Sequence, residues 1–107
     1  MKFEDLKKEI KVLEFGEVRL DNDDSFEGVI RKKDLEALNA KLVSVFGAPA
    51  WPSAAKLSTE VKLVIDPLGG VMAGQTLYFK HTDDFSVFVM LWPWGDKEHI
   101  TVKAGRK

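Results

Sequence analysis

Residues 75–107, QTLYFKHTDDFSVFVMLWPWGDKEHITVKAGRK, decide the fold of this chain. Apolar residues alternate with other residues along the stretch, and polar groups interrupt it where hairpin turns would be needed. Thr82-Asp83-Asp84 is typical of a three-residue turn, and Gly95 suits the first central position of a two-residue type II′ turn. The stretch therefore predicts an antiparallel three-stranded meander, with strands at about 75–81, 85–92 and 98–103.

The two turns set a register, and the register sorts the strand residues onto two faces. We expect Phe79 opposite Val87 in the first strand pair, and Val89 opposite Val102 in the second. One face is then uniformly apolar and belongs to the core: Leu77, Phe79, Phe85, Val87, Val89, Leu91, Ile100 and Val102. The other face, which we call the mixed face, carries large side chains in its middle and polar ones at its edges: Thr76, Tyr78, Lys80, Phe88, Met90, Trp92, His99, Thr101 and Lys103.

Four large side chains lie together on this mixed face: Tyr78, Phe88, Met90 and Trp92. Such a group is unusual on a sheet face that meets only water, so we expect the face to be covered. We favour coverage by N-terminal segments of the same chain. The alternative is a partner, a second copy of the chain or a ligand, because aromatic residues and Met are enriched at interface centres. Burial of the four side chains under the chain's own helices would remove the reason for that alternative.

The remaining sequence predicts two or three helices. Apolar residues recur at helical spacing over 3–14 and 32–46, and a glycine follows each stretch. Residues 54–65 fit either a helix or a strand. We favour a helix because serines offer N-caps at its start and Pro67 offers an end.

Two short strands are also predicted before the second helix. Residues 17–20 and 26–30 flank the acidic turn 21–24 and could pair with each other. The predicted fold class is therefore α+β, with an antiparallel sheet of three to five strands and at least one helix on its apolar face.

Length and composition limit the kinds of function. A chain of 107 residues with 45% hydrophobic and 31% charged residues predicts a single globular domain, 1–107. There are no cysteines, which excludes thiol catalysis and thiolate metal sites. A net charge of -1 gives no overall attraction to nucleic acid or anionic lipid. The longest apolar run, 85–94, is too short to cross a bilayer, and the charged start carries no export signal, so we expect a cytoplasmic protein.

Two segments resemble known ligand loops but lack residues that those loops need. Residues 69–76 have the glycine spacing of a phosphate-binding loop, but Gln75 replaces the lysine that contacts phosphate. Residues 21–25 resemble the start of a calcium loop, but Phe26 and Lys32 replace the required glycine and glutamate. A connecting segment and a solvated acidic turn explain them better. No cofactor and no metal site is predicted.

The two histidines each have acidic neighbours in the sequence. His81 precedes Asp83 and Asp84, and His99 follows Asp96 and Glu98. The predicted register places the histidines at opposite ends of the meander, so they cannot share a metal within one chain. A small enzyme that uses His81 with Asp83 or Asp84 is one functional hypothesis, without a supporting catalytic motif.

All three tryptophans flank prolines, in Trp92-Pro93-Trp94 and Trp51-Pro52, and rigid aromatic loops can form a groove. The leading hypothesis is a non-enzymatic protein-interaction module, which acts through the mixed face and could form a homodimer. The alternative is a small-molecule binding domain with a pocket near the Trp-Pro-Trp end of the sheet. The candidate binding residues are Tyr78, Phe88, Met90, Trp92, Trp94, His99 and Trp51. Nucleic acid and membrane partners are not expected.

Overall fold

The structure of the chain is a computed structural model that describes residues 3–13, 15–51, 59–69, 74–81 and 86–106. Its elements, in chain order, are α1 (Phe3–Lys11), β1 (Glu17–Asp21), β2 (Ser25–Arg31), the 3₁₀ turn η1 (Lys32–Asp34), α2 (Leu35–Phe46), α3 (Thr59–Ile65), the 3₁₀ turn η2 (Asp66–Leu68), β3 (Thr76–His81), β4 (Ser86–Pro93) and β5 (His99–Arg106). The five strands form one antiparallel sheet in the order β1-β2-β5-β4-β3. The α+β class and the C-terminal meander are confirmed.

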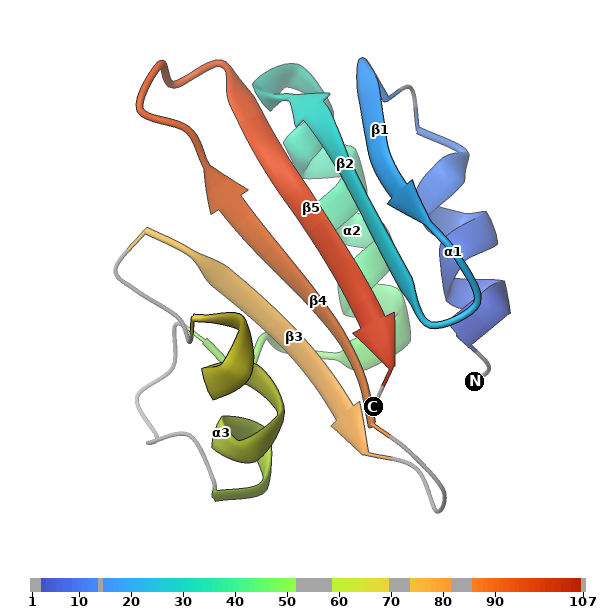
Figure 1. Cartoon of the computed structure of the whole chain (residues 1–107). Coiled ribbons are helices and arrows are strands. Elements are labelled where there is room, and N and C mark those ends of the chain that lie inside the picture. The colour runs from blue at the N-terminus through green and yellow to red at the C-terminus, as the bar shows by residue number, and fades with distance from the viewer. Residues whose placement is uncertain (1–2, 14, 52–58, 70–73, 82–85, 107) are drawn as a thin grey trace.

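The sheet separates two layers of helices, as Figure 1 shows. Helices α1 and α2 lie on one face, and α3 lies on the other face beside β3. We call these faces the inner face and the outer face. The larger core lies between the inner face and α1 and α2, where Phe3, Leu6, Leu38 and Leu42 are at most 1% exposed. This core holds most of the buried apolar side chains of the described residues.

The observed helices follow the predicted ones with small differences at the ends. Helix α1 ends at Lys11, before the predicted end at residue 14, which lies outside the described residues. The predicted 32–46 helix begins with the turn η1 and continues as α2. It ends where Gly47 adopts a φ of 80° and donates its N–H to Val43 O at 2.8 Å. The third helix is confirmed over Thr59–Ile65, whereas 54–58 lie outside the described residues.

The predicted register between the first two meander strands was wrong by one residue. Phe79 lies opposite Phe88, not Val87. Because His81 pairs with Ser86, the connection between β3 and β4 is one residue longer than the predicted turn 82–84. That connection, 82–85, lies outside the described residues. A shift of one residue moves the side chains of β3 to the opposite face relative to those of β4.

The predicted two-residue turn at Gly95 was also wrong, with a milder consequence. Trp94 N–H bonds to His99 O at 2.8 Å, so residues 95–98 form a longer turn. Its left-handed residue is Lys97, with a φ of 63°, rather than Gly95. Val89 therefore lies opposite Ala104 instead of Val102, a shift of two residues. An even shift leaves every side chain of β4 and β5 on its predicted face.

The shifted register exchanges the side chains of β3 between the faces, so Phe79 packs with the outer-face residues and not in the inner core. Tyr78 belongs to the inner face, where it is 3% exposed and donates its hydroxyl to Asn39 Oδ1 of α2 at 3.1 Å. Leu77 belongs to the outer face instead, together with Phe88 and Met90. Part of the outer face is covered by α3, whose Val61, Val64 and Ile65 pack on these three residues. The N-terminal helices thus cover the apolar face, and a later helix covers part of the mixed face.

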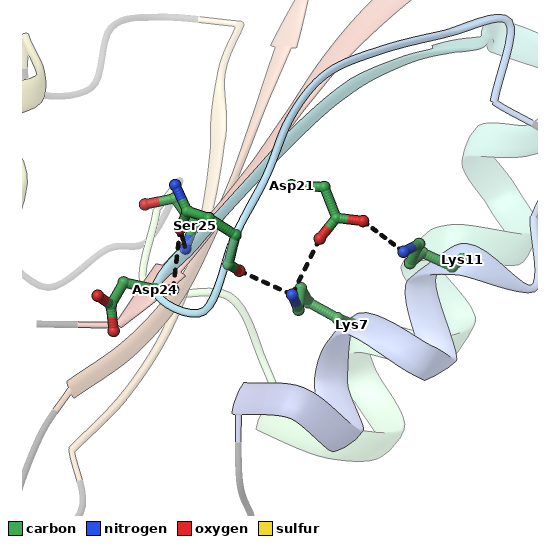
Figure 2. A network of polar contacts seen from close by, with 6 residues as sticks. Lys7, Lys11, Asp21, Asp24 and Ser25 are labelled. Atoms are coloured by element: carbon green, nitrogen blue, oxygen red, sulfur yellow. Dashed lines mark hydrogen bonds and ion pairs between the residues drawn. The ribbon is translucent and has the colours of Figure 1, made fainter.

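Helix α1 is held to the turn between β1 and β2 by a polar network, shown in Figure 2. Lys7 Nζ lies 2.9 Å from Asp21 Oδ1 and donates to Asn22 O, while Lys11 pairs with the other oxygen of Asp21. The hydrogen bond from Lys11, which has the larger effect, and the hydrogen bond from Lys7 lower the pKa of the Asp21 carboxyl. Asp24 pairs with Arg106 of β5 at 2.7 Å. The acidic turn is therefore neutralised by cationic side chains of the same chain.

Both edges of the sheet carry features that discourage further strand pairing. On β3, Leu77 forms a bridge with Trp51, and its N–H donates to Trp51 O at 2.8 Å. On β1, the pairing is irregular between Val18 and Leu20. Covered and irregular edges disfavour edge-to-edge association. Among the described residues, no helix combines the length and apolar character needed to span a membrane.

Candidate functional site

Several of the predicted binding residues lie inside the chain. Tyr78 is 3% exposed, Phe88 5% and Met90 0%. Trp51 and Trp92 are half-buried and pack against the cluster under α3. The chain's own helices therefore occupy the positions that suggested a partner on the mixed face. A protein partner at Tyr78, Phe88 and Met90 stays a prediction, but the exposed aromatic group that motivated it is absent from the described surface.

Trp94 and His99 remain accessible, and they lie together at the β4–β5 turn. Their rings are 4.9 Å apart and tilted by 35°. Trp94 Nε1 donates to Thr101 Oγ1 at 2.8 Å, which fixes the indole against β5. The guanidinium of Arg19, from β1, lies 5.6 Å from the Trp94 ring, within cation–π range. Sequence reasoning paired His99 with Trp92, whereas in the structure Trp92 lies opposite Thr101 and Trp94 contacts His99.

Asp96 organises this turn through its carboxylate. It accepts the backbone N–H groups of Glu98 at 2.8 Å and His99 at 3.1 Å, and Asp96 Oδ2 lies 2.6 Å from His99 Nδ1. The Glu98 N–H bond, followed by the His99 contact, lowers the pKa of the Asp96 carboxyl. An ionised carboxylate can only accept, so the contact places a proton on His99 Nδ1. The imidazole is thereby held in one orientation.

A cavity of about 450 Å³ opens beside this turn. Its lining residues come from two segments that are distant in sequence: Arg31, Lys32, Lys33, Lys97, Glu98 and His99. Two contacts bring the segments together. Arg31 lies opposite His99 in the β2–β5 pair, and Lys32 N–H donates to Glu98 O at 2.8 Å. The cavity is thus a product of the sheet topology.

The lining of the cavity is strongly cationic. It contains one arginine, three lysines and a single glutamate, which leaves an excess of three positive charges before His99 is counted. None of these four cations forms an ion pair with another described residue. Their charges are therefore available to a ligand. The whole chain, by contrast, has a net charge of -1.

Sequence reasoning identified only one residue of this cavity, His99, as a candidate. The Arg31-Lys32-Lys33 run is a basic cluster in the sequence, but such a run is also typical of a solvated helix start. One signal could have located the cavity. The basic run lies at the end of β2, and the Lys97 turn follows the end of β4 in the same sheet. Only the β2–β5 pairing shows that those strand ends are neighbours.

The other histidine lies at the opposite end of the sheet. His81 Nδ1 is 3.1 Å from Ser86 Oγ, across the β3–β4 pair. Asp83 and Asp84, its predicted acidic partners, lie outside the described residues. Within the part of the chain that is described, no group of three or more His, Asp or Glu side chains could hold a metal ion. The enzyme hypothesis at His81 stays a prediction.

Comparisons with protein-family models, curated proteins and solved structures found no match to this chain. A function can therefore be inferred only from the geometry and charge of the site itself.

Proposed function

We propose that this chain is a non-enzymatic binding domain for a small molecule, with its site at the end of the sheet where β4 meets β5. The observation that carries the proposal is the cavity of about 450 Å³ beside Trp94 and His99. Its volume lies within the range of about 300–1,000 Å³ that is typical of small-ligand sites. Of the three functions compatible with the sequence, this is the small-molecule binding domain, rather than the protein-interaction module or the enzyme at His81.

The walls of the site suit a binding role because they are held in place by the fold. Asp96 anchors the turn through two backbone N–H groups and the His99 ring. The Lys32–Glu98 backbone bond ties this turn to the start of η1. Preorganised walls reduce the entropy lost on binding. A cytoplasmic location for such a domain stays part of the proposal.

A thermal-shift screen of a broad metabolite library tests the proposal. We expect at least one compound to raise the melting temperature of the wild type, because a ligand that binds only the folded state stabilises it. The shift should be lost in His99→Ala and kept in His81→Ala, which removes the same side chain at the other end of the sheet. Tryptophan emission should respond in the wild type and in Trp51→Phe, but much less in Trp94→Phe.

Two results would contradict the proposal. One is a library in which no compound changes either the melting temperature or the emission. The other is a stabilising compound whose effect is equal in His99→Ala and His81→Ala, because its site would then lie elsewhere.

A further inference from the structure

We infer that the ligand of this cavity carries a diphosphate group, which the cationic lining binds through charge-assisted hydrogen bonds. The inference rests on the proposed function and adds the chemical class of the ligand. Its basis is the convergence of Arg31, Lys32 and Lys33 from one segment with Lys97 from another around a single cavity.

The amount of charge around the cavity fits a diphosphate. Four cations and Glu98 leave three uncompensated positive charges around about 450 Å³. A single phosphate ester carries about 1.5 to 2 negative charges near neutral pH, so it would leave part of this charge unbalanced. A diphosphate adds a further ionised phosphoryl group at nearly the same place. Its charge therefore matches the excess of the lining more closely.

The cations of the cavity are also available to a ligand. Elsewhere on the described surface, many cationic side chains are neutralised by carboxylates of the chain: Lys7, Lys11, Arg19, Lys41, Lys103 and Arg106. The four cations of the cavity have no such partners among the described residues. A ligand would meet them without breaking an existing ion pair. Because the chain as a whole is slightly acidic, the attraction is local to this end of the sheet.

The kinds of donor around the cavity also suit phosphate oxygens. Arginine presents a planar fork that matches two phosphate oxygens, while lysine contributes a compact point charge. Arg31 supplies the fork, and Lys32, Lys33 and Lys97 supply the point charges. Phosphate groups are typically bound in this way, by several donors placed around a compact group with many acceptor oxygens. A ligand that carried the same charge on carboxylate groups would have to be a larger molecule.

The test is isothermal titration calorimetry of the full chain with inorganic pyrophosphate, inorganic phosphate and citrate at low ionic strength. We expect pyrophosphate to bind most tightly, and its affinity to fall as sodium chloride is added. In Lys33→Gln/Lys97→Gln, the affinity for pyrophosphate should fall roughly tenfold or more, because two charged donors are lost. Both side chains are exposed, so this variant should keep its fold, as circular dichroism will verify.

The matched control is Lys8→Gln/Lys62→Gln, which removes the same charge from exposed positions of α1 and α3 that do not line the cavity. Its affinity for pyrophosphate should equal that of the wild type. An equal loss of affinity in both double variants would overturn the inference, because only the overall charge of the chain would then matter. Citrate that binds as tightly as pyrophosphate would overturn the assignment to phosphate.

Two further outcomes separate this inference from the proposed function. A metabolite that stabilises the wild type but not His99→Ala, while pyrophosphate gives no heat of binding, would refute the diphosphate and leave the binding domain standing. No stabilising metabolite and no heat with pyrophosphate would refute both. Tighter binding of a single-stranded dT oligonucleotide than of pyrophosphate, lost in Lys33→Gln/Lys97→Gln, would replace the small ligand by a nucleic acid.

Discussion

Gly105 of β5 lies directly opposite Phe88 of β4, and the Phe88 ring covers it. A Cβ atom at Gly105 would stand 2.7 Å from Phe88 Cζ, which is too close for an ordinary contact. The ring is 5% exposed and packs in the cluster under α3, so it has little room to move. The missing side chain of Gly105 is therefore part of the packing of the outer face.

We expect Gly105→Ala to lower the free energy of unfolding by about 1–3 kcal/mol, as overpacking does in other cores. Urea denaturation measures this effect. Gly95→Ala is the control, because a Cβ there would meet nothing within 4 Å. Equal stabilities of the two variants would show that the Phe88 ring can make room at little cost.

Asp96 gives a second prediction at the scale of a single residue, because hydrogen bonds lower the pKa of its carboxyl. A lowered pKa in the folded state means that ionised Asp96 stabilises the fold at pH values above the ordinary aspartate value of about 3.9. This contribution is lost as the pH falls through the folded-state pKa. We therefore expect Asp96→Asn to be less stable than the wild type at pH 6, with a difference that shrinks toward pH 3.

Urea denaturation of both proteins across this pH range measures that difference. A difference that stays constant, or grows as the pH falls, would contradict the assigned role of the carboxylate in the β4–β5 turn.

At the scale of the elements, α3 determines how much of the outer face is closed. Its Ile65 is 1% exposed and packs with Leu77, Phe88 and Met90. Two residues before it, Leu63 is 70% exposed on the same helix. The two aliphatic side chains thus offer a matched pair for measuring what this contact contributes.

We expect Ile65→Ala to cost about 2–4 kcal/mol of the free energy of unfolding, because it leaves a cavity in a packed cluster. Leu63→Ala should change the stability by less than about 0.5 kcal/mol, as exposed substitutions usually do. Chemical denaturation of both variants measures the contrast. Similar costs at the two positions would mean that α3 does not pack on the sheet through this face.

The elements themselves could be predicted from the sequence, but their relative placement could not. Helical periodicity located Leu38 and Leu42, and alternation located the strands of the meander. The face of Tyr78 depended on the length of one connection, and a difference of one residue reversed it. The cavity was less predictable still, because Arg31 and His99 meet only through pairing of strands that are distant in sequence. Periodicity reports which side of an element is buried, not which elements become neighbours.

For the whole molecule, a substitution at Phe88 tests whether this ring belongs to the internal core or to an interface between copies of the chain. Its ring lies under α3 of the same chain, so a charged side chain at this position would be buried without a partner. We expect Phe88→Lys to abolish cooperative unfolding or to lower the melting temperature severely. Circular dichroism and light scattering over a range of protein concentrations test this together. A wild-type dimer that Phe88→Lys separates into stable folded monomers would contradict the assignment of Phe88 to the core.

The distribution of charge is the other property of the whole molecule. A nearly neutral chain concentrates three uncompensated positive charges around one cavity, at the end of the sheet away from His81. Charge arranged in this way attracts an anion to one place rather than to the whole surface. The charge distribution therefore predicts that an anion binds at this cavity.

Amide chemical-shift mapping by NMR during a titration with inorganic pyrophosphate tests whether the anion binds there. We expect saturable shift changes at residues 31–33 and 94–99, with little change at 59–65. Saturable changes centred on other residues, or no change at 31–33 and 94–99, would contradict binding at this cavity.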